Sequence, residues 1–184
     1  MDGEERRSAL LRIIQGSEAP VSAGRLAAKL GVSRQIIVGD VALLRAAGFE
    51  IAATPRGYLL PPSPDSGNGI RRRIACRHRR EQMKEELCAI VDQGCQVLDV
   101  IVEHPVYGEL TGSLCLSSRY DIEQFDAKCS AEGASPLSLL TEGIHLHTIQ
   151  CPDEAAFERV CRVLREMGIL LSSAQDMKDA PSNP

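Results

Sequence analysis

A segment of proline, glycine and small polar residues interrupts the chain at residues 61–69. It reads Pro-Pro-Ser-Pro-Asp-Ser-Gly-Asn-Gly, and almost none of its side chains could help to build an apolar core. Such a composition is typical of a linker. We therefore expect two domains, residues 1–60 and 70–171, followed by a polar, proline-containing flexible tail over residues 172–184.

Charge and hydropathy limit the classes of protein that the chain can belong to. No run approaches the roughly 18 apolar residues of a membrane helix, and the start Met-Asp-Gly-Glu-Glu is unlike a signal peptide. We therefore expect a cytoplasmic protein with no membrane partner. Residues 1–60 hold eight Lys/Arg against six Asp/Glu, whereas the remainder holds thirteen against nineteen. A basic N-terminal region followed by an acidic remainder favours a small DNA-binding domain attached to a regulatory domain.

The seven cysteines are spaced seven or more residues apart, and none forms a Cys-x-x-Cys pair. Such pairs are the usual sign of a zinc ribbon or a redox motif. In a reducing cytosol we predict that these cysteines are small, buried apolar residues.

The first domain has three stretches of helical periodicity followed by two short strand patterns. The helical stretches are residues 5–15, 23–30 and 33–47. A short turn containing Gly31 separates the second stretch from the third, which predicts a helix-turn-helix. The strand patterns, at residues 49–53 and 58–60, flank a Thr-Pro-Arg-Gly turn and predict a wing.

The third helix is the candidate reader of double-stranded DNA. When such a helix enters the major groove, its N-terminal residues reach the base edges, and here these are Ser33, Arg34 and Gln35. Arg34 can bridge guanine O6 and N7, and Gln35 can contact adenine or a phosphate. Arg56, in the wing turn, suits a phosphate or the minor groove. The alternative is that these polar residues only solvate the N-terminus of the helix.

Beyond the linker, strand patterns alternate with helical ones. We expect strands at residues 70–78, 95–103, 107–116 and 143–150, and helices at 81–93, 120–133 and 153–167. The predicted fold class is α+β: a winged helix-turn-helix, then an α+β sandwich with a mixed sheet and helices on one face.

The second domain contains all four histidines of the chain. The strand period of two places His145 and His147 on one face, with backbones about 7 Å apart. His78 ends a strand, and Glu86 lies on the apolar side of the next helix, where a carboxylate needs a partner. These four residues are candidate ligands for a divalent transition ion such as Ni, Zn, Fe or Co. Hydrogen-bonded histidines near the surface, with a marginal glutamate, are the alternative.

Two resemblances add to this interpretation. Residues 6–60, through Ser33-Arg34-Gln35, Gly48 and Gly57-Tyr58, resemble the DNA-binding domain of the biotin repressor. The second domain is similar to the 3H domain. The resemblance lies in the basic strand that ends in His78, in Glu86, in residues 102–110 and in His145-Leu146-His147. A winged helix-turn-helix followed by a 3H domain resembles the NiaR family, nicotinate-responsive repressors of NAD biosynthesis and niacin uptake genes, over about residues 6–170.

This resemblance implies a homodimer, nicotinic acid as co-repressor, and one divalent metal ion per chain. The family's metal ligands match His78, Glu86, His145 and His147 one for one. Gly39 departs from the expected pattern, because a longer helix-forming residue is expected in the interior of the third helix. That departure puts only local DNA affinity in doubt.

His104 and Tyr107 follow an apolar strand, beside Pro105, and are candidate contacts for the effector. The alternative is that His104 only pins the loop. The basic run from Arg71 to Arg80 could attract a carboxylate or a phosphate, but a solvated strand face is the more common use of such a run.

Two enzymatic functions are alternatives to a repressor. The three-His, one-Glu set could activate water in a metal hydrolase, although a ligating Glu86 leaves no obvious general base. A biotin ligase is disfavoured because the second domain is short and lacks a glycine-rich nucleotide-binding stretch.

Overall fold

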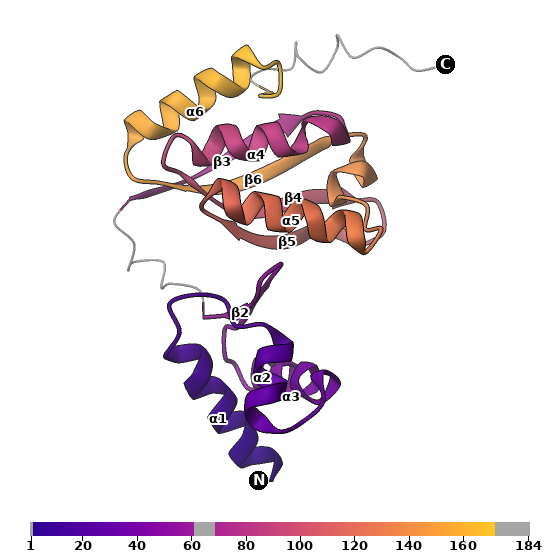
Figure 1. Ribbon diagram of the computed structural model, residues 1–184. Helices are drawn as coiled ribbons and strands as arrows, with labels where there is room; N and C mark the ends of the chain where they lie inside the picture. Colours follow the sequence, from indigo (N-terminus) through magenta and orange to yellow (C-terminus); the bar gives the residue numbers. More distant parts are fainter. Residues whose placement is uncertain (1, 61–68, 172–184) are drawn as a thin grey trace. The chain divides into compact units, whose positions relative to one another are not determined.

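The computed structural model describes residues 2–60 and 69–171, and the chain divides into two compact units, Met1–Gly67 and Asn68–Pro184 (Figure 1). The predicted tail and all of the predicted linker except Gly69 lie outside the described residues. Within the described ranges, no helix is both long and apolar enough to cross a membrane.

The first unit is a winged helix-turn-helix. Its described elements are α1 (Gly3–Gln15), α2 (Ala23–Leu30), α3 (Arg34–Ala46), β1 (Ala52–Thr54) and β2 (Gly57–Leu59). Ser22 and Ser33 cap α2 and α3, because each side chain accepts a hydrogen bond from a backbone N–H of the first turn. α2 ends at Gly31, whose left-handed φ of 65° allows the tight turn into α3.

One apolar core holds this unit together. Leu10 of α1, Leu26 of α2 and Ile37 of α3 are fully buried and pack in the same cluster. The wing is attached to the helices through its second strand, since Val21 and Tyr58 exchange two backbone hydrogen bonds of 2.8 and 2.9 Å. The apolar core therefore holds α3 against α2, and Arg45 of α3 donates a 2.8 Å hydrogen bond to the carbonyl oxygen of Ile51, just before the wing.

The second unit combines a four-stranded sheet with helices. Its described elements are β3 (Ile70–Arg77), η1 (Arg80–Gln82), α4 (Met83–Val91), β4 (Gln96–His104), β5 (Gly108–Leu116), α5 (Arg119–Ala131), η2 (Leu137–Thr141), β6 (Ile144–Cys151) and α6 (Glu154–Glu166). This arrangement confirms the predicted α+β class.

The sheet has the strand order β3-β6-β4-β5, and every described pairing in it is antiparallel. The prediction of a mixed sheet was therefore wrong. β3 and β4, joined through α4, do run in the same direction, as a β-α-β crossover requires. They are not neighbours, however, because β6 lies between them and pairs antiparallel with both.

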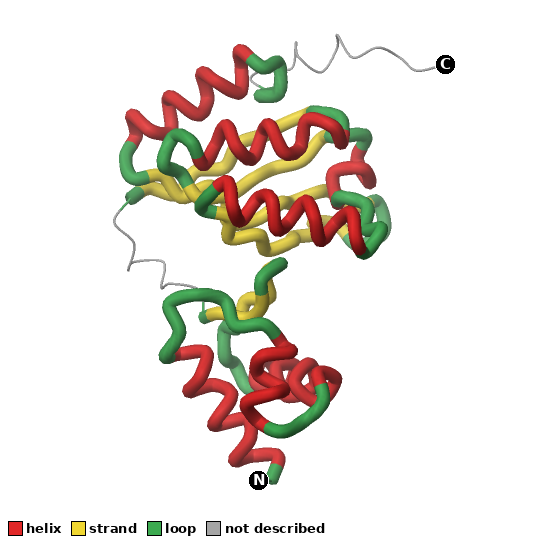
Figure 2. The backbone as a smooth tube through the Cα atoms, in the orientation of Figure 1, coloured by secondary structure: helices red, strands yellow, loops and turns green. Residues whose placement is uncertain are grey.

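The helices cover one face of the sheet. Figure 2 shows α4 and α5 in front of the same face, with the strands behind them. The burial of β6 alternates strictly, and Ile149 and Cys151 on its inner face belong to the core that contains Leu87, Ile122 and Leu164 of the helices. By the strand period of two, His145 and His147 lie on this inner face as well.

Candidate metal centre and DNA-reading helix

Three elements bring the candidate metal ligands together. His78 directly follows β3, Glu86 lies in α4, and His145 and His147 project from β6. The turn before β6 approaches the end of β3 so closely that a Cβ on Gly143, with its φ of 89°, would collide with the carbonyl oxygen of His78. Glycine is therefore required where the two strands converge.

The three imidazoles surround the carboxylate of Glu86. The Nε2 atoms of His78, His145 and His147 lie 2.6, 3.3 and 3.4 Å from the nearest Glu86 oxygen. All four side chains are at most 3% exposed. Adjacent rings meet edge to face, with centroids 4.8 Å apart for His78–His145 and for His145–His147. The structure thus gathers the four predicted residues into one buried cluster.

The opposite nitrogen of each ring is held by the backbone. Nδ1 of His78 lies 2.7 Å from the carbonyl oxygen of Arg79, that of His145 2.9 Å from Gly143, and that of His147 2.6 Å from Asp99. A carbonyl only accepts, so each Nδ1 carries the hydrogen and donates it. In a neutral ring, the Nε2 lone pair then points at Glu86. Anchoring of this kind is typical of metal-binding histidines.

A β-bulge supplies one of these anchors. The β4–β6 pairing is irregular between Val97 and Ile101, and Asp99 lies within that interval. Its carbonyl receives the Nδ1 hydrogen of His147, and its carboxylate accepts a 2.9 Å hydrogen bond from the backbone of Thr148. The bulge therefore turns a strand residue toward the site, as bulges commonly do beside functional groups.

The charge states of Glu86, His78 and His147 depend on one another. Burial opposes a charge on Glu86, but the charge of His147 and hydrogen bonds to the three imidazoles hold the Glu86 pKa well below its ordinary value. Burial likewise opposes a charge on His78 and His147, yet the hydrogen bond and charge of Glu86 raise the pKa of both rings. The site favours an ionised carboxylate with a positive charge beside it.

The donor set fits a divalent transition ion. Three neutral rings would direct lone pairs at an anion, whereas three imidazoliums would leave net positive charge in a buried site, which is costly. A cation bound between the rings and the carboxylate satisfies all four groups at once. Three imidazole nitrogens and a carboxylate suit Ni, Zn, Fe or Co.

A further side chain at this centre was not predicted. The sequence predicted Cys76 as a buried apolar residue, but its Sγ, a Glu86 oxygen and a His145 nitrogen lie within 4.8 Å of one another. Cys76 pairs with His145 in the β3–β6 register. Its separation of two residues from His78 was the available signal, because that spacing places both side chains on the same face of one extended segment.

The predicted DNA-reading residues lie at the start of α3 and in the wing. Ser33 is the N-cap, and its side chain accepts a 3.3 Å hydrogen bond from the backbone of Ile36. Arg34 and Gln35 begin the helix and are exposed. Arg56 lies in the turn between β1 and β2, where its backbone N–H donates to the Thr54 hydroxyl. The hydroxyl of Ser33 is thus already used by the helix, whereas Arg34 and Gln35 present exposed side chains.

His104 and Tyr107 lie in the β4–β5 hairpin. Nδ1 of His104 accepts hydrogen bonds from the backbone N–H groups of Val106 and Tyr107, at 3.2 and 3.3 Å. The rings of His104 and Tyr107 lie in contact, with centroids 4.9 Å apart and planes tilted by 35°. These contacts pin the hairpin, and a contact of His104 and Tyr107 with the effector stays a prediction. His104 is five residues from Asp99 along β4, roughly 16 Å in an extended strand. The structure therefore does not bring this pair to the histidine cluster.

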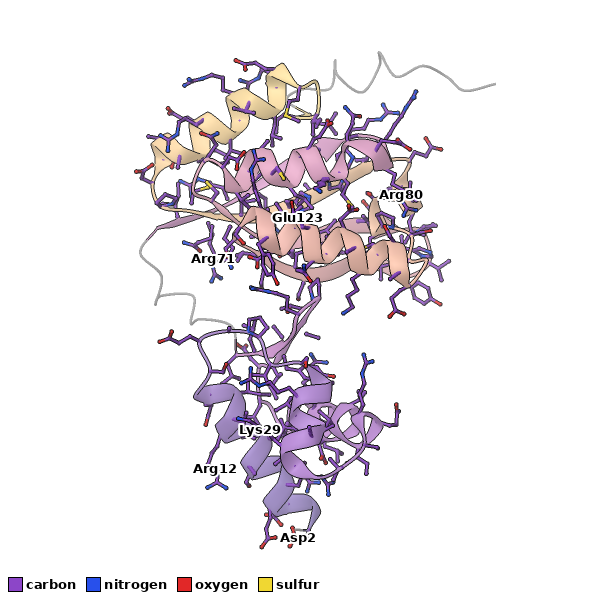
Figure 3. All side chains as sticks on the ribbon, viewed as in Figure 1. Asp2, Arg12, Lys29, Arg71, Arg80 and Glu123 are labelled. Carbon is purple, nitrogen blue, oxygen red and sulfur yellow. The ribbon has the colours of Figure 1, made fainter. Side chains whose placement is uncertain are left out.

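The basic run is partly engaged at the surface. Figure 3 shows Arg71 and Arg80 at opposite ends of the second unit, so the run does not form one compact patch. Arg71 donates to Gln150, and Arg72 pairs with Glu154 at 2.8 Å and lies over the ring of Phe157. These contacts support the interpretation as a solvated strand face.

Comparison with known proteins identifies both units. Residues 6–59 match the model of an HTH domain, and residues 71–173 match that of the 3H domain. The chain is 44% identical over 168 residues to the probable transcription repressor NiaR of Thermotoga maritima, covering 91% of this chain and 94% of that protein. It is 42% identical over 170 residues to the transcription repressor NadR of Bacillus subtilis, covering 92% and 94%.

The chain belongs to the NiaR family. It is a DNA-binding transcription repressor, and its relatives are repressors and not enzymes. The hydrolase alternative is thereby set aside. In this chain, the buried His/Glu cluster lies within the region that matches the 3H domain.

Proposed function

We propose that this repressor senses nicotinic acid and controls genes of NAD biosynthesis or niacin transport, as a homodimer with one divalent transition ion per chain. His78, Glu86, His145 and His147 hold the ion. The observation that carries this proposal is that three imidazoles, each anchored to the backbone through Nδ1, direct their Nε2 atoms at one buried carboxylate. The names of the two relatives, and the resemblance stated above, support the link to NAD metabolism.

The residues of the chain have distinct parts in this proposal. Bound metal would supply positive charge that neutralises Glu86 and joins the end of β3, α4 and β6. The carbonyls of Arg79, Gly143 and Asp99 fix the ring orientations, so that Nε2 of each histidine stays directed at the centre. With at most 3% of each ligand side chain exposed, water is largely excluded from the centre.

At the DNA, Arg34 and Gln35 read base edges and Arg56 contacts the backbone or minor groove. Nicotinic acid acts by binding the DNA-competent state of the dimer more tightly than the other states, since a ligand shifts an equilibrium only through such a difference. Coupling of this kind is reciprocal, so operator DNA raises nicotinate affinity by the same factor.

The test is operator binding with and without effector. A labelled promoter fragment of a niacin-uptake or NAD-biosynthesis gene is titrated with the metal-loaded protein at fixed salt, and anisotropy gives Kd. Nicotinate should tighten binding by about tenfold or more, whereas nicotinamide, which lacks the carboxylate, should have a much smaller effect. Equal Kd values with and without nicotinate would contradict the sensor role. Sedimentation of the same samples tests the homodimer.

A further inference from the structure

A buried thiol lies beside the candidate metal ligands. Cys76 is fully buried, and its Sγ, a Glu86 oxygen and a His145 nitrogen lie within 4.8 Å of one another. None of the four expected ligands is a sulfur donor, so the place of this side chain in the cluster needs its own explanation.

The backbone fixes where the thiol is directed. Along β3, Ile74 and Cys76 are buried, and His78 follows at the next position of the same period. Across the sheet, Ile74 pairs with His147 and Cys76 pairs with His145. Cys76 thus lies between His78 on its own strand segment and His145 on the neighbouring strand, on the face that carries both imidazoles.

Packing alone does not account for a cysteine here. Cys76 belongs to the apolar core that contains Ile74 and Leu87. Its sulfur, however, also lies within 4.8 Å of a Glu86 oxygen and a His145 nitrogen. Thiolate, imidazole and carboxylate are the side-chain ligands of zinc and related ions, so these three groups could share one cation. Burial and the charge of Glu86 raise the pKa of the metal-free thiol, so the cation itself must displace the thiol proton.

We propose that Cys76 is a thiolate ligand of the metal centre, which makes the donor set three nitrogens, one oxygen and one sulfur. This inference rests on the proposed metal site. On binding, the S–H bond of Cys76 breaks, the proton leaves to solvent, and a sulfur–metal bond forms with no change of oxidation state. A thiolate favours Zn, Ni, Co and Fe over hard ions such as Mg and Mn, so Cys76 contributes to metal selectivity.

Cobalt(II) titration of the full chain, freed of metal by a chelator, tests the proposal. Ligand-field bands report occupancy, and a near-ultraviolet thiolate-to-cobalt charge-transfer band reports sulfur ligation. The wild type should show both signals in proportion. Cys76→Ala should lose the charge-transfer band and bind Co(II) at least about tenfold more weakly. Cys88→Ala, two residues after Glu86 on α4 and half-buried, is the matched control and should keep the band.

The outcomes separate the two proposals. If the wild type binds cobalt without a charge-transfer band, or if Cys76→Ala keeps the band, thiolate ligation is wrong and the His/Glu site stands. If the wild type binds no cobalt, nickel or zinc, the metal site itself is wrong. X-ray absorption of the zinc-loaded wild type needs no variant and should find one sulfur neighbour at about 2.3 Å; a shell of nitrogen and oxygen alone would overturn the inference.

Discussion

At the residue level, the charge of Glu86 is the feature of the candidate metal site that is most easily tested. Glu86 is fully buried, and the three imidazoles hold its pKa well below the ordinary value. Glu86→Gln keeps the shape but removes the charge that balances a cation. We expect zinc affinity, measured by competition with a chelator, to fall by at least about a hundredfold, since a ligand is lost outright. Glu85→Gln, one position away on the exposed side of α4, is the control and should bind zinc as the wild type does.

Gly39 lowers the stability of α3, and no contact within its own unit requires a glycine at this position. It lies exposed in α3, and a Cβ there would have no atom within 4 Å. Gly39→Ala should therefore raise stability by about 1 kcal/mol. Because Gly39 is one turn after Gln35 on the DNA-reading helix, we expect the same change to weaken operator binding by obstructing close approach.

Thermal unfolding and operator anisotropy measure the two effects of Gly39→Ala separately. Gly24→Ala is the matched control, because it is also an exposed helical glycine with no atom within 4 Å of a Cβ, but in α2. It should show the stabilisation alone. Unchanged operator affinity in Gly39→Ala would mean that this face of α3 does not approach the DNA.

Among the structural elements, the His/Glu cluster joins the end of β3, helix α4 and strand β6. In the metal-free protein, Glu86 raises the pKa of His78 and His147. The stability that their protonation contributes is thus complete below pH ~6.5 and is lost as pH rises through the raised values. The depressed pKa of Glu86 acts at the acid limit, where stability is lost as pH falls through that value.

A bound ion should reverse the slope near neutral pH. Protons compete with metal for the imidazoles, so the stabilisation from metal grows as pH rises. Imidazoles titrate between about pH 6 and 8. As pH rises through this range, we expect the midpoint temperature of thermal unfolding to fall in the chelated protein and to rise in the zinc-loaded protein. Parallel slopes in the two samples would contradict this account.

The sequence predicted the elements better than their assembly. Periodicity located the helix-turn-helix and placed His145 and His147 on one face, because side-chain direction follows from local backbone geometry. It did not show that β6 lies between β3 and β4, which made the sheet antiparallel, because pairing is decided by packing at long range. The Asp99 bulge and the place of Cys76 beside His145 were missed for the same reason, since both depend on strand register.

For the whole molecule, we propose that the affinity of the repressor for DNA depends on both the effector and the metal ion. The double variant Arg34→Ala, Gln35→Ala should abolish preference for the operator over unrelated DNA, because each lost base contact costs about 1–3 kcal/mol. Its metal content should be that of the wild type, because the proposed metal ligands lie in the other unit. Arg12→Ala, on α1, is the control and should leave the operator preference intact.

The most direct measurement is the metal content of the purified chain. Elemental analysis of protein prepared without a histidine tag should give about one divalent transition ion per chain, and His145→Ala, His147→Ala should lose nearly all of it. His104→Ala, in the β4–β5 hairpin away from the cluster, should retain the ion. Equal metal content in the wild type and the double variant would contradict the assignment of His78, Glu86, His145 and His147 as the metal centre.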